Sequence, residues 1–364
     1  MPVRPTPQSG VMQIAPYVPG RSSAGGGSSG KIVKLSSNES PLGASPAAIA
    51  ALEGLGNTLA AYPDGSSSDL RQAIAQTQGL EAERIVVGAG SDELLHLLAQ
   101  TYLGEGDEAV ISQFGFLVYP IVTKGAGAQP IFAWDKDYCV DVDAMLGAVS
   151  ERTKLVFLAN PNNPTGTYVS EAELMRLHAG LRPDILLVVD SAYAEYVTAN
   201  DYAAGDRLVR DSDNVVMVRT FSKIGLAALR IGWMYGPAHI VDAVNRLRGP
   251  FNVNRAAQLA GEATVRDVEF VARLKAHNKK WRDWLTSELN RNRIRILPSQ
   301  GNFVLALFEE DGGKAAKKAN EALLEAGLIV REMGAYGLPD ALRISIGEER
   351  AMRAVAKVLK GLNE

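Results

Sequence analysis

Cysteine and histidine are scarce in this chain of 364 residues. The one cysteine, Cys139, excludes a framework of disulfides within the chain and suits a reducing compartment. The four histidines are scattered without the spacing of metal ligands, so we expect no metal site. An excess of positive charge is also missing, since the formal net charge is −3, and this argues against nucleic acid or an anionic membrane as a partner.

Long apolar runs are missing as well. None reaches the roughly 18 residues that a membrane-spanning helix needs, so we expect no membrane span. The first 20 residues also lack the apolar segment of a secretory signal, and we therefore expect a cytoplasmic protein. With 46% hydrophobic and 22% charged residues, the composition is that of an ordinary globular protein.

The distribution of residue types along the chain predicts three parts. Residues 1–35 are rich in Pro, Gly and Ser and read as an N-terminal arm or lid. Strand-like and helix-like segments then alternate over residues 36–255, which predicts a large α/β domain with a mostly parallel central sheet flanked by helices. From about residue 256 a long helical stretch is followed by shorter strands and helices, which predicts a smaller α+β domain over residues 256–364.

Polar and aromatic segments follow five of the predicted strands of the large domain. Ligands of open parallel sheets bind at the carboxyl ends of the strands, so we expect these segments to form one rim. The segments are residues 90–92, 114–116, 160–166, 190–193 and 220–223.

Three of these segments each allow two interpretations when they are taken alone. "GAGSDE", residues 88–93, either holds a phosphate at a helix start or is an ordinary helix start, because Glu93 replaces the third glycine of G-x-G-x-x-G. "NPNNPTG", residues 160–166, either projects amide side chains or only ends a strand. Asp190, after five apolar residues, is either a helix N-cap or a buried carboxylate that needs a cationic partner.

Lys223 follows an apolar strand in "VVMVRTFSKIGLAALRIG", residues 215–232. Taken alone, it is a solvated turn residue more often than a catalyst. A lysine on the same rim as Asp190, a helix start and Arg230 matches the needs of a phosphorylated aldehyde with a pyridine nitrogen, because a lysine amine forms Schiff bases. That cofactor is pyridoxal phosphate.

The motifs "NPNNPTG", "DSAY" and "TFSKIGLAALRIG" together resemble those of the fold-type-I pyridoxal-phosphate aminotransferases. More narrowly, "SSNESPLG", "AYPDG", "GAGSDELL" and "YGLPDALRISIG", in this order, resemble the histidinol-phosphate aminotransferase family over residues 15–350. The resemblance implies a homodimeric enzyme of histidine biosynthesis. It would exchange amino groups between histidinol phosphate and 2-oxoglutarate by a ping-pong route.

The resemblance also implies a role for each matching residue of the cofactor site. Lys223 would carry the cofactor as an internal aldimine and move the proton, Asp190 would pair with the pyridine nitrogen, and Tyr193 with Asn163 would bind the phenolic oxygen. Phe116 would stack on the ring. The residues that would bind the phosphate are Gly90, Ser91, Asp92, Thr220, Ser222 and Arg230, joined by Tyr62 from the other subunit.

The residues that match the family's substrate site come from both ends of the chain. Arg343 would clamp the α-carboxylate of the amino-acid donor, and Arg331 would favour the phosphate of histidinol phosphate. Tyr17 would belong to an N-terminal lid, and Asn38 would lie close to the substrate.

Two details depart from the family pattern. Lys223 and Arg230 are seven residues apart, whereas many relatives have eight. The turn after the lysine is therefore shorter, and the structure of this turn decides whether Arg230 reaches the cofactor phosphate. Phe114, Gly115 and Phe116 stand where many relatives read Pro-Thr-Tyr, so the stacking ring lacks a hydroxyl.

Three alternatives remain: one differs in substrate only, and two belong to other classes of protein. An aminotransferase for aromatic amino acids or prephenate would use the same scaffold and the same Arg343. A nicotinamide-dependent dehydrogenase would leave Lys223 without a role, and a cofactor-binding regulator would need a DNA-binding module that the chain does not provide.

Overall fold

The computed structural model describes residues 7, 10–21, 32–308 and 313–362. The parts of the predicted arm at residues 1–6, 8–9 and 22–31 lie outside the described residues. Across the residues that are described, no helix has the length and apolar character that are needed to cross a bilayer.

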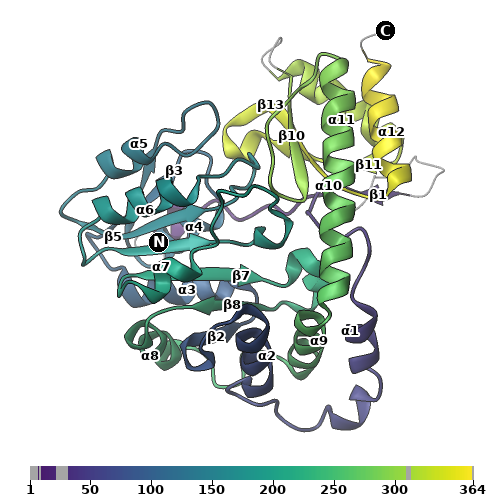
Figure 1. Cartoon of the computed structure of the whole chain (residues 1–364). Coiled ribbons are helices and arrows are strands. Elements are labelled where there is room, and N and C mark those ends of the chain that lie inside the picture. The colour runs from purple at the N-terminus through teal and green to yellow at the C-terminus, as the bar shows by residue number, and fades with distance from the viewer. Residues whose placement is uncertain (1–6, 8–9, 22–31, 309–312, 363–364) are drawn as a thin grey trace, which may run out of the picture.

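The larger of two main sheets has seven strands in the order β2-β8-β7-β6-β5-β3-β4 (Figure 1). Its strands are β2 (Ile85–Gly88), β3 (Glu108–Ser112), β4 (Gln129–Ala133), β5 (Thr153–Ala159), β6 (Leu186–Asp190), β7 (Val215–Thr220) and β8 (Gly232–Tyr235). Strand β8 runs antiparallel to both of its neighbours, while the other pairings are parallel. The predicted, mostly parallel α/β sheet is thus confirmed, and β8 is a strand that the sequence interpretation missed.

Helices cover both faces of this sheet because its strands are apolar on both sides. One face packs against α3 (Ser91–Tyr102), α4 (Val118–Gly125) and α8 (Ala238–Leu247). The other face packs against α2 (Ser68–Gln78), α5 (Val142–Gly147), α6 (Glu171–Gly180), α7 (Asp206–Arg210) and α9 (Arg255–Arg266), with α1 (Pro46–Ala51) beside α9. The sheet is therefore the middle layer of three.

The smaller sheet is antiparallel, in the order β12-β13-β10-β9. Its strands are β9 (Arg295–Ile296), β10 (Phe303–Leu307), β12 (Arg331–Met333) and β13 (Leu338–Ser345). It packs with α10 (Val268–Arg291), α11 (Lys314–Glu325) and α12 (Glu349–Lys360). A short parallel pair, β1 (Val33–Lys34) with β11 (Leu328–Ile329), joins the N-terminal segment to this unit.

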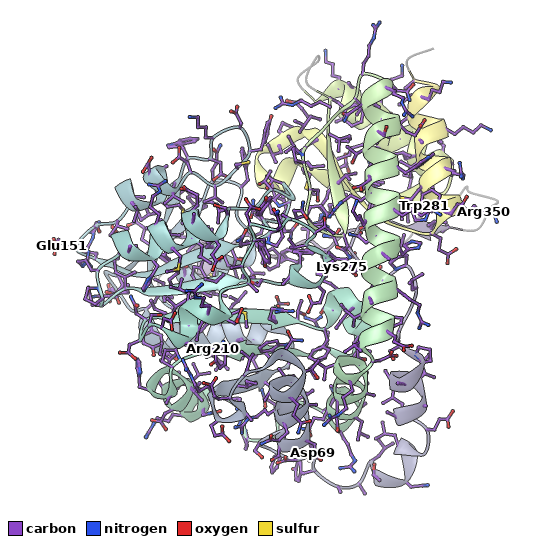
Figure 2. The ribbon with its side chains drawn as sticks, viewed as in Figure 1. Asp69, Glu151, Arg210, Lys275, Trp281 and Arg350 are labelled. Atoms are coloured by element: carbon purple, nitrogen blue, oxygen red, sulfur yellow. The ribbon has the colours of Figure 1, made fainter. Side chains whose placement is uncertain are left out.

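The long helical stretch predicted from about residue 256 is two helices, α9 and α10, which meet at Asp267. The first turns of α10, with Phe270 and Leu274, pack in the core of the large sheet, and Trp281 packs in the core of the small one. Figure 2 shows Lys275 on the side of α10 toward the large sheet and Trp281 on the side toward α12. We propose that the chain divides into an N-terminal arm, a large domain and a small domain, and that the change from the large core to the small core falls within α10 and not at residue 255.

Candidate active site

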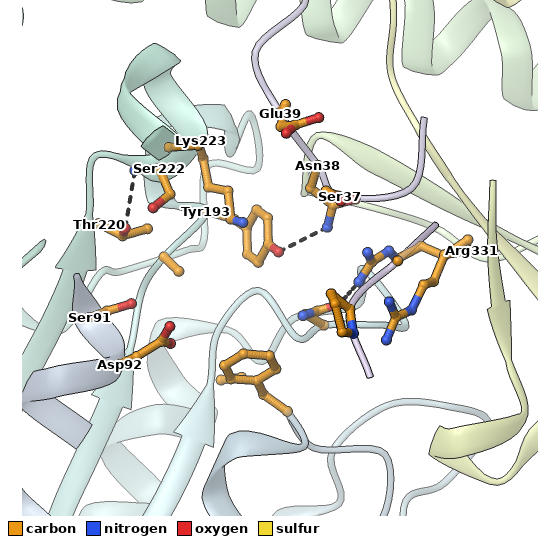
Figure 3. A pocket seen from close by; sticks show the side chains of 18 of the residues that line it. Ser37, Asn38, Glu39, Ser91, Asp92, Tyr193, Thr220, Ser222, Lys223 and Arg331 are labelled. Carbon is orange, nitrogen blue, oxygen red and sulfur yellow. Dashed lines mark hydrogen bonds between the residues drawn. The ribbon is translucent and has the colours of Figure 1, made fainter. Parts of the chain in front are cut away.

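The polar rim expected from the sequence lines a cavity of about 340 Å³ between the two sheets. Fourteen of the predicted site residues line it: Tyr17, Asn38, Ser91, Asp92, Phe116, Asn163, Asp190, Tyr193, Thr220, Ser222, Lys223, Arg230, Arg331 and Arg343. Figure 3 shows Lys223 beside Tyr193, with Ser91, Asp92 and Thr220 on one side and Arg331 on the other. Two predicted residues, Gly90 and Tyr62, do not line the cavity.

Lys223 lies in an irregular turn directly after β7. Gly225 within this turn has φ 101°, and a side chain there would come 2.4 Å from the carbonyl oxygen of Gly43, so the close approach requires glycine. The buried hydroxyl of Tyr196 donates to the carbonyl oxygen of Lys223. The lysine Nζ lies 5.6 Å from the centre of the Tyr193 ring. The hydrogen bond from Tyr196 thus fixes the backbone of Lys223, while its side chain lines the cavity.

Asp190, the last residue of β6, is a buried carboxylate and not a helix N-cap. The hydroxyl of Tyr119 donates to its Oδ2 over 2.8 Å, and the amide of Ala192 donates to its Oδ1 over 3.2 Å. Burial raises the pKa of Asp190 to about 6, against the lowering effect of these hydrogen bonds and of Lys223. A cationic partner would stabilise the charged form of Asp190, as a protonated pyridine nitrogen would do.

Tyr119 was missed by the sequence interpretation. It lies on α4, is buried, and stacks on Phe157 with ring centres 4.8 Å apart. A signal was present, since a tyrosine on the apolar face of a buried helix needs a partner for its hydroxyl. The partner, Asp190, is 71 residues away in the sequence.

A set of donors suited to a phosphate gathers where α3 begins. The Nη2 of Arg230 lies 3.0 Å from Oδ2 of Asp92, and its Nη1 lies 3.4 Å from Oγ of Ser222. Arg230 adopts a left-handed conformation, with φ 52°, which turns it back toward α3. The seven-residue spacing from Lys223 therefore still brings the guanidinium to the start of this helix.

Two glycines make room for this arrangement. A side chain at Gly90, which has φ 88°, would meet Nη2 of Arg230 at 2.9 Å. One at Gly232, on β8, would come 2.4 Å from the amide nitrogen of Ser91. The backbone amides at the start of α3, the hydroxyls of Thr220 and Ser222 and the guanidinium of Arg230 form a site that favours an anion.

Two arginines lie side by side at the other end of the cavity. Arg331 on β12 and Arg343 on β13 are direct cross-strand partners, and both are buried. Arg343 donates to Oδ1 of Asn163 and to the carbonyl oxygen of Ser36, while its buried Nε has no hydrogen-bond partner among the described residues. A buried guanidinium with an unused donor indicates an anionic ligand.

The N-terminal segment closes this end of the cavity. Arg331 donates to the carbonyl oxygen of Val18 over 2.8 Å and lies 5.8 Å from the centre of the Tyr17 ring. Asn38 donates to the hydroxyl of Tyr193 over 3.0 Å. Residues 17–20 and 36–38 thus connect the arginines of the small sheet to the strand ends of the large one.

An α/β sheet with a lysine at one strand end, a buried carboxylate at the next and an anion site at a helix start is the arrangement of a pyridoxal-phosphate-dependent enzyme of fold type I. The described residues fit the cofactor: a carboxylate for its nitrogen, an aromatic ring beside it and donors for its phosphate. The sequence profile of the family "Aminotransferase class I and II" matches residues 30–359. The chain belongs to this family and, within it, to the histidinol-phosphate aminotransferases.

Relatives and solved structures carry this assignment. The histidinol-phosphate aminotransferase of Rhodospirillum rubrum is 53% identical over 98% of this chain and 96% of its own length. That of Rhodopseudomonas palustris strain BisB18 is 52% identical over 98% of both chains. The histidinol-phosphate aminotransferase of Sinorhizobium meliloti, solved in complex with pyridoxal-5'-phosphate, superposes with a TM-score of 0.88, at 27% identity and over 97% of both chains. These findings exclude the dehydrogenase and regulator alternatives.

Proposed function

We propose that the enzyme moves the amino group of L-histidinol phosphate to 2-oxoglutarate, giving imidazole-acetol phosphate and L-glutamate. The observation that carries this proposal is the buried pair Arg331 and Arg343, which offers two guanidinium groups to substrate anions. A phosphate with two negative charges suits such a pair better than a neutral ring does. The relatives at 51–53% identity carry the name of this activity.

Pyridoxal phosphate, when bound, supplies an aldehyde carbon that takes up the amino group and a ring that withdraws electrons. Lys223 would hold the cofactor and then carry the proton from the substrate α-carbon. Asp190 would keep the pyridine nitrogen protonated, and Tyr193 with Asn163 would donate to the phenolic oxygen. Phe116 would lie on the ring face.

Anion binding is divided between the two ends of the cavity. Arg230, Ser222, Thr220 and the first amides of α3 would hold the cofactor phosphate. Arg343 would bind the α-carboxylate of glutamate and 2-oxoglutarate. Arg331 would bind the substrate phosphate, with Tyr17 and Asn38 covering the substrate and excluding water.

The choice of substrate can be tested by comparing kcat/KM for L-histidinol phosphate, phenylalanine and tyrosine as amino donors and prephenate as acceptor. We expect histidinol phosphate to exceed the aromatic substrates by at least about tenfold, and Arg331→Gln to lower its kcat/KM by roughly 100-fold while phenylalanine changes little. Arg246→Gln, on the exposed face of α8, is the control. A tenfold preference for an aromatic substrate would contradict the proposal.

We also propose that two copies form a dimer in which Tyr62 reaches the neighbouring cofactor phosphate. Tyr62 is 79% exposed, lies outside its own cavity and stacks on Phe251 at 4.5 Å. Exposed apolar side chains extend the surface around it, as is usual for a subunit contact. They are Leu59 and Phe251, which line the same surface hollow as Tyr62.

Mixed dimers test the role of Tyr62. Tyr62→Phe removes one donor to a phosphate, so we expect its Kd for pyridoxal phosphate to rise about tenfold. A mixed dimer pairs one Tyr62→Phe chain with one Lys223→Ala chain. Only the site of the Tyr62→Phe chain keeps Lys223, and this site receives an intact Tyr62 from the Lys223→Ala partner. That site is expected to regain wild-type affinity in a titration, and no recovery would show that Tyr62 acts within its own chain.

We further propose a cytoplasmic location, because the single Cys139 suits a reducing compartment.

A further inference from the structure

Glu93 occupies the position at which a dinucleotide-binding turn has its third glycine, and none of the roles above uses it. It is the third residue of α3, and its Oε2 accepts from the amide of Ala89 over 2.5 Å. The same oxygen accepts from Nδ2 of Asn252 over 2.6 Å. A carboxylate at this position that bonds back to the preceding backbone resembles half of a capping box. It spans the turn that presents the amides of Ser91 and Asp92.

Asn252 continues this contact away from the helix. Its Nδ2 also donates to the carbonyl oxygen of Val87 at the end of β2, over 3.2 Å. Its Oδ1 accepts from Nη1 of Arg248 over 2.7 Å. The amide of Asn252 therefore lies between a carboxylate and a guanidinium, where each hydrogen bond polarises the next.

Arg248 connects the network to the loop that carries Tyr62. Its Nη1 donates to the carbonyl oxygen of Gly65 over 2.9 Å. A side chain at Gly65 would come 2.4 Å from the carbonyl oxygen of Pro250, so the two loops are in close contact. Burial lowers the pKa of Arg248, and the charge of Glu93 opposes this effect. Arg248 is thus partly desolvated, which strengthens its electrostatic attraction to Glu93 across Asn252.

We propose that Glu93 is a positioning residue for the cofactor phosphate. It holds the start of α3 against Arg230 and, through Asn252 and Arg248, fixes the loop that presents Tyr62 to the neighbouring subunit. One network thereby sets both the phosphate donors of its own site and the donor lent to the other site. The inference rests on the phosphate site proposed above.

The test compares two ligands that differ only in the phosphate: pyridoxal phosphate and pyridoxal, each titrated into the cofactor-free protein. We expect Glu93→Ala to raise the Kd of pyridoxal phosphate about tenfold and to leave that of pyridoxal unchanged. Glu93→Gln keeps an acceptor oxygen and should stay within about threefold of wild type. Glu173→Ala, at the same position of α6, is the control.

A purely structural role for Glu93 would weaken both ligands equally, and that result would overturn the proposal, as would an unchanged ratio of the two Kd values. If Glu93→Ala does not fold, Asn252→Ala decides by the same ratio. Arg230→Ala separates this inference from the site it rests on. If Arg230→Ala keeps the wild-type ratio of the Kd for pyridoxal to the Kd for pyridoxal phosphate, the phosphate site itself is refuted. If Arg230→Ala changes this ratio and Glu93→Ala does not, only the role of Glu93 is refuted.

The link to Tyr62 needs a double-mutant cycle. If Asn252 acts through the loop, Tyr62→Phe should weaken pyridoxal phosphate less in the Asn252→Ala background than in the wild type. Strictly additive effects would overturn the link between the turn and the loop.

Discussion

Lys223→Ala is expected to lower the rate of amino transfer by at least about 10⁴-fold, because it removes both the covalent attachment and the group that moves the proton. Cofactor binding should persist, since Arg230, Ser222 and the start of α3 are unchanged. The measurement is the transamination rate, together with borohydride reduction, which should fix the cofactor to the wild-type chain and not to the variant.

The specificity of this result can be controlled with Lys279→Ala, which removes an exposed lysine of α10 that pairs with Asp283. This variant should match the wild type in both measurements. If Lys223→Ala retains a tenth of the activity, or if borohydride still fixes the cofactor, another amine carries out the chemistry.

Asp190→Asn should have opposite effects on activity and on the stability of the cofactor-free protein. The neutral amide cannot hold a proton on the pyridine nitrogen by charge, so we expect kcat to fall on the order of 10³-fold. The side chain is nearly isosteric, and its oxygen can still accept from Tyr119. The fall in kcat should therefore come without a loss of fold.

The stability effect follows from the raised pKa of Asp190, about 6 in the folded protein against an ordinary 3.8. A carboxyl with a raised folded pKa incurs no penalty below its ordinary pKa, and the penalty grows to roughly 3 kcal/mol as the pH rises past 6. Cofactor-free Asp190→Asn should therefore melt several degrees above the wild type at pH 8 and close to it at pH 4. If the Tm of Asp190→Asn lies below that of the wild type at both pH values, the buried charge of Asp190 does not destabilise the folded protein.

The residues whose convergence the sequence predicted lie where parallel strands end, because that topology brings distant segments to one edge. Lys223, Asp190 and Asn163 were found in this way, and their convergence on one cavity followed from the sheet. The partnership of Arg331 and Arg343 depends on the register between two strands of the small sheet, which no local pattern reveals. The family resemblance indicated these two residues, and only the fold shows that they face each other.

The features that sequence reasoning missed depend on long-range contacts. Strand β8 is a four-residue apolar segment between two glycine-containing turns, too short to show a period. The contact of Glu93 with Asn252 joins residues 159 positions apart. The reach of Arg230 depends on its left-handed backbone, a conformation that the count of residues from Lys223 does not determine.

The cavity takes the residues proposed for the cofactor from the large sheet and its two arginines from the small one. Among the described side chains, Asn163 with Arg343 and Tyr193 with Asn38 join these halves. Changes on β12 and β13 can therefore alter which compound is accepted while Lys223 and Asp190 keep their surroundings. Such a separation makes the protein a favourable starting point for engineering: libraries confined to the small sheet and residues 17–20 would explore new amino donors while the surroundings of Lys223 stay unaltered.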